Sequence, residues 1–418
     1  MIKTMLNQFT NIKKFFLLGI AVASTKVMLL LFAYFFDAED YNLFNQIYYT
    51  ASLIILFGSL GFNIAVTRIN VSFNVVYVAV AINAVLAYLF LQIISAPFHN
   101  LFEIASILLY SVFISIAGIF VFHLLFSGRY KDYVLLTLLY SVLHLLIIPA
   151  ILFLKVSLFT ILPVISLLWL LIGFPKYLKK DNPSFKHFAE FYKVGISAFV
   201  INSAVSLALA ADKYFVNHFF NLDVANSYTF AWGLTAPIFY IGGIIEQFLF
   251  SEANPSKLNI LKRGLILSTT LVVIYSVTLL VVVGFFPGLL PSSVNSGYLI
   301  NILALMIAGY SFYVIFHFPV NAYLFKSLGT EKQKTISLIF SLIIAVFVIL
   351  YILIMQGIIA INYIWLLVVT WSYIFTLLLA KIIIMFRKEI GSEPAETIMG
   401  MKNPCQPKAD QPTAETFK

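Results

Sequence analysis

The sequence predicts an all-α polytopic membrane protein of about twelve transmembrane helices, arranged as two parallel-related six-helix lobes around a central cavity. Of its 418 residues, 62% are apolar and only 10% are charged, whereas soluble globular domains have roughly 45–50% and about 25%. The apolar runs are long enough for helices of about 20 residues, the length that crosses a bilayer. The turn between the first two runs also recurs in the second half of the chain.

Charged residues and Pro, Gly or Asn divide the apolar runs into helices. In the first half we expect helices at 15–36, 43–66, 74–95, 101–126, 133–154 and 156–174. In the second half we expect them at 194–216, 226–250, 264–286, 298–325, 335–355 and 360–385. These groups predict an N-terminal lobe with a cytoplasmic linker (1–190), a C-terminal lobe (191–388) and a disordered cytoplasmic tail (389–418) whose polar composition cannot form a core.

The first run could also be read as a signal peptide, because Lys13 and Lys14 precede it and Ala21-Val22-Ala23 lies within it. Only six apolar or small residues stand before Ala21, and the run continues to Phe36. We therefore expect a retained first helix rather than a cleaved leader.

The positive charges indicate how the helices are oriented. Of the 26 Lys and Arg residues, only Lys155 falls in a loop on the outward side, while Lys26 and Lys213 lie inside apolar runs. All the others lie in the termini or the even-numbered loops. By the positive-inside rule both termini are cytoplasmic, and the net charge of +9 needs no nucleic acid to explain it.

An internal repeat relates the two halves. Residues 35–39 (Phe-Phe-Asp-Ala-Glu) align with residues 219–223 (Phe-Phe-Asn-Leu-Asp), and Phe44 aligns with Tyr228. Each segment ends one helix, passes a short acidic turn and enters the next. Because six helices separate the copies, the two lobes run in the same direction, as in transporters with parallel repeats.

Lys26 is the most informative polar residue of the predicted helices. It lies 11 positions into the first run, which places it about 16 Å deep at 1.5 Å per residue. A cation at the bilayer centre costs roughly 2.5–3.5 kcal/mol even on the lenient insertion scale. We expect Lys26 to face a watery cavity or an anion, with a structural ion pair to another helix as the alternative.

Asp212 and Lys213 come late in the seventh helix, near the predicted outer boundary. Lys213 is expected to be able to snorkel outward to water. Neighbouring positions on a helix do not share a face, so the two charges are not expected to neutralise each other, and one of them is expected to point into the cavity.

Three further features are weaker candidates. Arg68 closes the second helix, either as a cytoplasmic stop or as a phosphate contact suited to its planar guanidinium. His144, in the middle of the fifth helix, is a candidate proton relay or a helix-to-helix hydrogen-bond partner. Pro237 with Gly242-Gly243 is a candidate hinge in the eighth helix, because such residues free backbone groups within a bundle.

The chain resembles the Wzx-type O-antigen flippases of the multidrug/oligosaccharidyl-lipid/polysaccharide exporter superfamily. Residues 32–44 and Leu60 to Arg68 are similar to that family's first hairpin, and residues 192–195, 212–216 and 226–234 to its seventh and eighth helices. The resemblance implies movement of an undecaprenyl-diphosphate-linked O-antigen repeat unit across the bacterial inner membrane, as a step of lipopolysaccharide biosynthesis. Lys26, Arg68, Lys213 and Asp212 would line the cavity, and an O-antigen polymerase and a chain-length regulator are possible partners besides membrane lipids.

Two other functions remain open. One is an ion-coupled small-molecule exporter of the same superfamily, although the first two helices have no Asp or Glu in their apolar cores. The other is a membrane enzyme such as an O-antigen polymerase. The sequence has no metal-binding or nucleophile motif, so we expect no catalytic residues, no metal and no cofactor. Whether H⁺ or Na⁺ drives transport is left open.

Overall fold

The computed structural model describes residues 2–69, 71–95, 97–126, 129–175, 187–251, 257–327 and 330–386. The predicted tail, 389–418, lies outside the described residues. Within the described part the chain is helical, and no strand is formed.

A helix lies over each of the twelve predicted segments. The first half forms α1 (Ile2–Phe35), α2 (Ala38–Ser59), α3 (Phe62–Arg68), α4 (Phe73–Ser95), α5 (Leu101–Phe126), α6 (Tyr130–Leu145), α7 (Ile147–Leu152) and α8 (Leu158–Gly173). The second half forms α9 (Phe188–Phe219), α10 (Leu222–Ser251), α11 (Lys257–Phe285), a 3₁₀ turn at Pro287–Leu289, α12 (Ser296–Ser327), α13 (Thr330–Met355) and α14 (Tyr363–Phe386). Seven of the described helical stretches are long and apolar enough to cross a membrane by themselves. The chain is therefore a multi-pass membrane protein.

The second predicted helix is not continuous, because the chain turns at Leu60 and Gly61. Both residues have positive φ, 38° and 71°. A Cβ on Gly61 would lie 2.3 Å from the carbonyl oxygen of Gly195 and 2.7 Å from the amide nitrogen of Phe199. Only glycine allows the backbone of α9 to pass this close, so the turn between α2 and α3 is also a lobe contact.

The fifth predicted helix is likewise divided, into α6 and α7. Pro149 has no N–H to donate to the carbonyl of Leu145, and its ring clashes with that carbonyl in a regular helix. The helix α6 ends at Leu145 for this reason, and α7 begins at Ile147.

The predicted repeat is visible in the turns of the two hairpins. The helix α1 ends at Phe35 and α2 begins at Ala38, while α9 ends at Phe219 and α10 begins at Leu222. In the first turn, Asp37 Oδ1 accepts from the Asp40 amide at 2.8 Å. In the second, Asn221 Oδ1 accepts from the Val224 amide at 3.0 Å. The same side-chain cap therefore starts α2 and α10.

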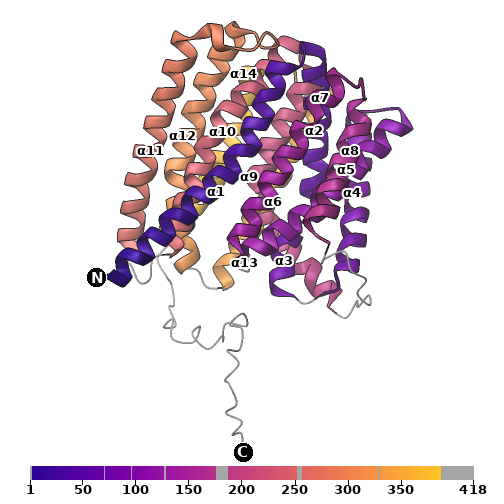
Figure 1. Ribbon diagram of the computed structural model, residues 1–418. Helices are drawn as coiled ribbons and strands as arrows, with labels where there is room; N and C mark the ends of the chain where they lie inside the picture. The colour runs from indigo at the N-terminus through magenta and orange to yellow at the C-terminus, as the bar shows by residue number, and fades with distance from the viewer. Residues whose placement is uncertain are drawn as a thin grey trace, which may run out of the picture. The chain divides into compact units, whose positions relative to one another are not determined.

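The lobe helices α1, α2, α9 and α10 meet in the middle of the bundle. In Figure 1, α11 and α12 lie on one side of them and α4, α5 and α8 on the other. Close contacts of α1 with α10, of α2 with α9 and α10, and of α3 with α9 join the halves. The helix α9 is bent by 67° between Val200 and Ala204.

Hydrogen bonds between the halves gather where α1 turns into α2 and α9 into α10, here called the hairpin end. Asn226 donates to the Ala38 carbonyl at 2.9 Å, and Gln46 donates to the Asn217 carbonyl at 2.8 Å. Ser293 donates to the Ala33 carbonyl at 2.6 Å. These side chains hold the backbone of the opposite half, so the hairpin end is closed.

Candidate functional site

The indole ring of Trp232, on α10, lies close to two lysines from different helices. The Nζ atom of Lys213, on α9, is 3.9 Å from the ring centroid. The Nζ atom of Lys26, on α1, is 5.8 Å from the same centroid and 5.7 Å from that of Tyr240. All three distances are within the range in which a cation is attracted by the face of an aromatic ring.

Helix register brings Lys26 and Trp232 to one level. Lys26 is nine residues before the end of α1 and Trp232 is ten residues after the start of α10. At 1.5 Å per residue, both lie about 14–15 Å below the hairpin end, which is half the thickness of a hydrocarbon core of about 30 Å. The position of Lys26 near the bilayer centre stays a prediction.

Lys213 does not snorkel outward, so that expectation is wrong. Its side chain is 1% exposed and runs back along α9, donating to the carbonyl of Leu209 and, at 2.9 Å, to Oδ1 of Asp212. Long helical side chains lean toward the helix N-terminus, and for Lys213 that direction leads toward Trp232. The expectation that Asp212 and Lys213 do not neutralise each other is also wrong, because away from water the flexible lysine stem wraps around to reach the carboxylate.

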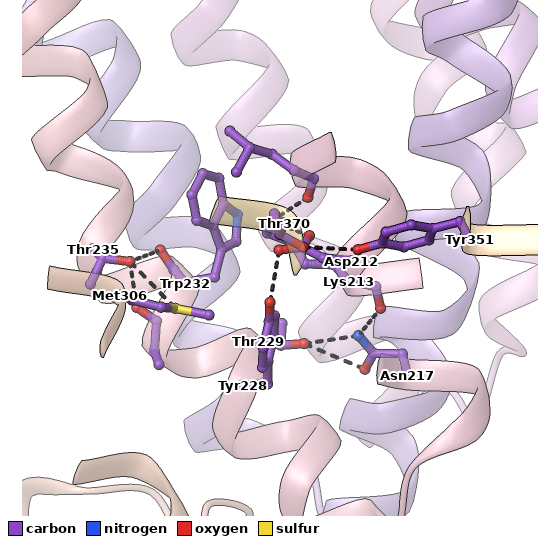
Figure 2. A network of polar contacts seen from close by, with 12 residues as sticks. Asp212, Lys213, Asn217, Tyr228, Thr229, Trp232, Thr235, Met306, Tyr351 and Thr370 are labelled. Atoms are coloured by element: carbon purple, nitrogen blue, oxygen red, sulfur yellow. Dashed lines mark hydrogen bonds and ion pairs between the residues drawn. The ribbon is translucent and has the colours of Figure 1, made fainter. Parts of the chain in front are cut away.

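Asp212 is fully buried and has a second partner. The hydroxyl of Tyr228, nearly two turns into α10, donates to Asp212 Oδ2 at 2.7 Å. Figure 2 shows Tyr228 pointing toward Asp212, with Asn217 and Thr229 beside them. Asn217 Nδ2 donates to the Lys213 carbonyl at 2.8 Å and to Thr229 Oγ1 at 3.0 Å. This network fixes α9 against α10.

We call Lys26, Lys213, Asp212, Tyr228 and Trp232 the lysine–tryptophan cluster. Its two cations differ in charge balance. Lys213 is neutralised by Asp212, while Lys26 takes part in none of the ion pairs formed among the described residues. The cluster therefore carries one net positive charge at mid-span, at Lys26.

A small cavity adjoins the cluster between α1, α2 and α10. It measures about 10 Å³ and is lined by Leu29, Leu30, Tyr41, Asn45, Tyr49, Thr229, Trp232 and Gly233. The amide nitrogen of Asn45 is buried with no hydrogen-bond partner among the described residues. This volume is about that of one water molecule, so a larger ligand reaches the cluster only if the two halves separate.

The remaining predicted residues lie elsewhere. Arg68 ends α3, and its side chain lies outside the described residues. His144 is fully buried in the first half, with Nδ1 2.9 Å from the Tyr140 carbonyl and Nε2 3.4 Å from the Tyr110 hydroxyl. Ser141, three residues before His144 on α6, forms a hydrogen bond with Ser24 of α1 at 2.9 Å. Ser24 lies two positions before Lys26 on α1.

The candidate hinge lies in a continuous α10. The helix runs through Pro237 without interruption. A Cβ on Gly242 would meet the ring of Phe318 at 2.1 Å, so this glycine allows α12 to pack closely. A Cβ on Gly243 would meet nothing within 4 Å.

Sequence reasoning missed Trp232, Tyr228 and Tyr240. The chain has 23 Tyr, 42 Phe and 4 Trp residues, so no single aromatic residue stands out. A signal exists in their spacing, because positions 228, 232 and 240 share one face of a helix.

Among the described residues no group of three His, Cys, Asp or Glu is placed to hold a metal ion.

Comparison with solved structures identifies the fold. The chain is similar to an inward-facing multidrug resistance MATE family transporter of the MOP superfamily, with a TM-score of 0.51 and 14% identity. The similarity covers 91% of this chain and 96% of that one. No protein-family model and no curated protein matches the sequence. The chain therefore has the two-lobe helical fold of MOP-superfamily transporters.

Proposed function

We propose that the chain is a flippase that moves a diphosphate-linked lipid oligosaccharide, an undecaprenyl-diphosphate O-antigen unit, from the cytoplasmic to the periplasmic leaflet. The observation that carries the proposal is the unbalanced charge of Lys26 beside Trp232, at mid-span and at the contact between the halves. A cation at this depth is costly unless an anion or water accompanies it. A diphosphate group supplies that anion.

The lysine–tryptophan cluster suits such a substrate in a second way. Trp232 offers an aromatic face next to both cations. The ring attracts the lysines weakly, by about 0.5–2 kcal/mol, so a phosphate oxygen outcompetes it through charge-assisted hydrogen bonds of greater strength. The ring thus keeps the ammonium groups in place without blocking them.

Transport requires the closed hairpin end to open after the substrate has entered from the other side. In the proposed cycle the halves rock about the cluster, as in transporters with parallel repeats. The proposal places the protein in the bacterial inner membrane with both termini in the cytoplasm, because the Lys and Arg residues gather on that side.

An ion-coupled small-molecule exporter is the second candidate. The similar solved structure is described as a multidrug resistance transporter, and Asp212 provides a buried carboxylate in the cluster. Against a cationic substrate stands Lys26, which would repel it at the same place. Catalysis has no support, since the similar structure is that of a transporter.

The experiment compares surface polysaccharide in a deletion strain that carries the wild type, Lys26→Ala or Lys131→Ala at equal membrane levels. Lys131 is an exposed cation at the start of α6 and serves as the control. We expect the deletion to remove long polysaccharide and to leave lipid-linked units in the inner leaflet. Lys26→Ala should restore polysaccharide at least several-fold less well than Lys131→Ala. Long polysaccharide in the deletion strain, with raised drug sensitivity, would favour the exporter instead.

A further inference from the structure

A large apolar groove lies between α12 and α14, apart from the lysine–tryptophan cluster. It measures about 800 Å³. The wall on α12 includes Ala308, Gly309 and Phe312, and the wall on α14 includes Trp371, Ser372 and Leu379. Phe312 is 51% exposed and Leu379 is 56% exposed, so the groove is open along its side.

One ring, that of Trp371, lies between the backbones of α12 and α14 in the groove. Trp371 lies flat against Gly309, where a Cβ would be 2.3 Å from its Cε2 atom. In the first half, α5 and α8 take the equivalent places in helix order and approach each other closely along their backbones. The helices α12 and α14 show scarcely any such approach and meet instead through large side chains. The fourth and sixth helices are therefore packed less closely in the second half than in the first.

The position of the groove determines what fills it. Both α12 and α14 are long and apolar enough to span a membrane, and the groove lies within those stretches. Water does not fill an apolar space at this depth, and an empty one would cost its lining atoms their dispersion contacts. The exposed rim residues, which include Leu305 and Val368, lie within these stretches, where the acyl chains of a bilayer would contact them.

We propose that this groove binds one acyl chain of a membrane phospholipid. The chain lies along Trp371 and Phe312 and fills the space that α14 leaves beside α12. Lipid binding at this site does not depend on which substrate the protein transports.

The bound chain also supports the lysine–tryptophan cluster from behind. The ring of Trp371 lies 4.5 Å from that of Tyr310, and Tyr310 lies 5.2 Å from Trp232, between ring centroids. Tyr310 is fully buried. Two aromatic rings, those of Trp371 and Tyr310, therefore separate the acyl chain from the ring beside the two lysines.

The test is native mass spectrometry of the full chain, stripped of lipid in detergent and titrated with dioleoylphosphatidylethanolamine. The variants Ala308→Phe and Ser372→Leu add bulk to opposite walls of the groove. Val346→Phe adds similar bulk on an exposed face of α13 and is the control. Elution as a single species and an unchanged unfolding temperature without lipid identify variants that fold.

We expect the wild type and Val346→Phe each to bind and retain one molecule of the added phospholipid. Each groove variant should bind it at least ten-fold more weakly. Added lipid should raise the unfolding temperature of the first pair and leave that of the groove variants unchanged. Equal retention by all four proteins would overturn the proposal. So would binding of a polyprenyl phosphate in the groove without binding of the phospholipid.

Discussion

At the scale of single residues, charge balance distinguishes the two lysines that face Trp232. Lys213 is held by Asp212, and Asp212 is held in turn by Tyr228. Buried ion pairs add little net stability, but removal of one partner leaves a buried charge and costs about 3–5 kcal/mol. The pair is therefore better understood as a positioning device than as a source of stability.

This asymmetry predicts the outcome of substitutions at Asp212. Asp212→Asn leaves Lys213 without a counter-charge and should lower the free energy of unfolding by about 3–5 kcal/mol. The double variant Asp212→Asn with Lys213→Met should recover most of that loss, because it removes both charges. Chemical unfolding of each purified variant in detergent measures its free energy of unfolding. A double variant as unstable as the single one would contradict the assigned pairing.

Tyr228→Phe tests the second partner of the carboxylate. It removes one hydrogen bond to a charged group, worth about 1.5–3 kcal/mol, and keeps the ring that is fully buried in α10. We expect a loss of that size in the same unfolding experiment. In the background Asp212→Asn the loss should shrink, since the acceptor is then neutral.

At the scale of elements, substitutions at two adjacent glycines of α10 distinguish a role in helix packing from a role in helix bending. Gly242→Ala would place a Cβ 2.1 Å from the ring of Phe318, whereas at Gly243 the space is open. We expect Gly242→Ala to destabilise the protein through overpacking, by about 1–3 kcal/mol. Gly243→Ala should stabilise it by about 0.4–1 kcal/mol, since alanine costs less entropy in a helix.

Transport by Gly243→Ala then reports on the predicted hinge. Lower transport with unchanged or higher stability supports bending at this position. Wild-type transport in the same variant leaves Pro237 as the remaining candidate for a bend in α10.

The helices also show which parts of the fold and of the site the sequence predicts. Hydropathy predicts where helices form, because a span must be apolar along about 20 residues, and seven of the described stretches are long and apolar enough to cross a membrane by themselves. It does not predict the turn at Leu60-Gly61, which depends on the close passage of α9. Lys26 was found because a charge in an apolar run is rare. Trp232 was not, because only the register of α1, α9 and α10 brings it close to two lysines.

At the scale of the whole molecule, hydrogen bonds at the hairpin end keep the two halves closed there. Ala33 is 1% exposed behind them. In a Cys405→Ser background, Ala33→Cys should react slowly with a membrane-impermeant maleimide. Adding Gln46→Ala and Asn226→Ala removes two of the side-chain donors that hold the opposite backbone, so labelling should rise several-fold.

Leu101→Cys provides the control for that experiment. Leu101 is 80% exposed at the start of α5, so its labelling should be the same with and without the two substitutions. Equal labelling of Ala33→Cys in both backgrounds would show that other contacts close the hairpin end.

The two halves, whose hairpin turns match, can be compared with the two subunits of a homodimer. In a true homodimer with two-fold symmetry every contact occurs twice. Asn226 donates to the Ala38 carbonyl, and the alignment of the turns makes Asn42 the equivalent of Asn226. Asn42 does not repeat the contact among the described residues, and its Oδ1 is buried without a partner. The two halves of a single chain need not copy each other in this way, so one interface can carry a lysine from each half in unlike surroundings.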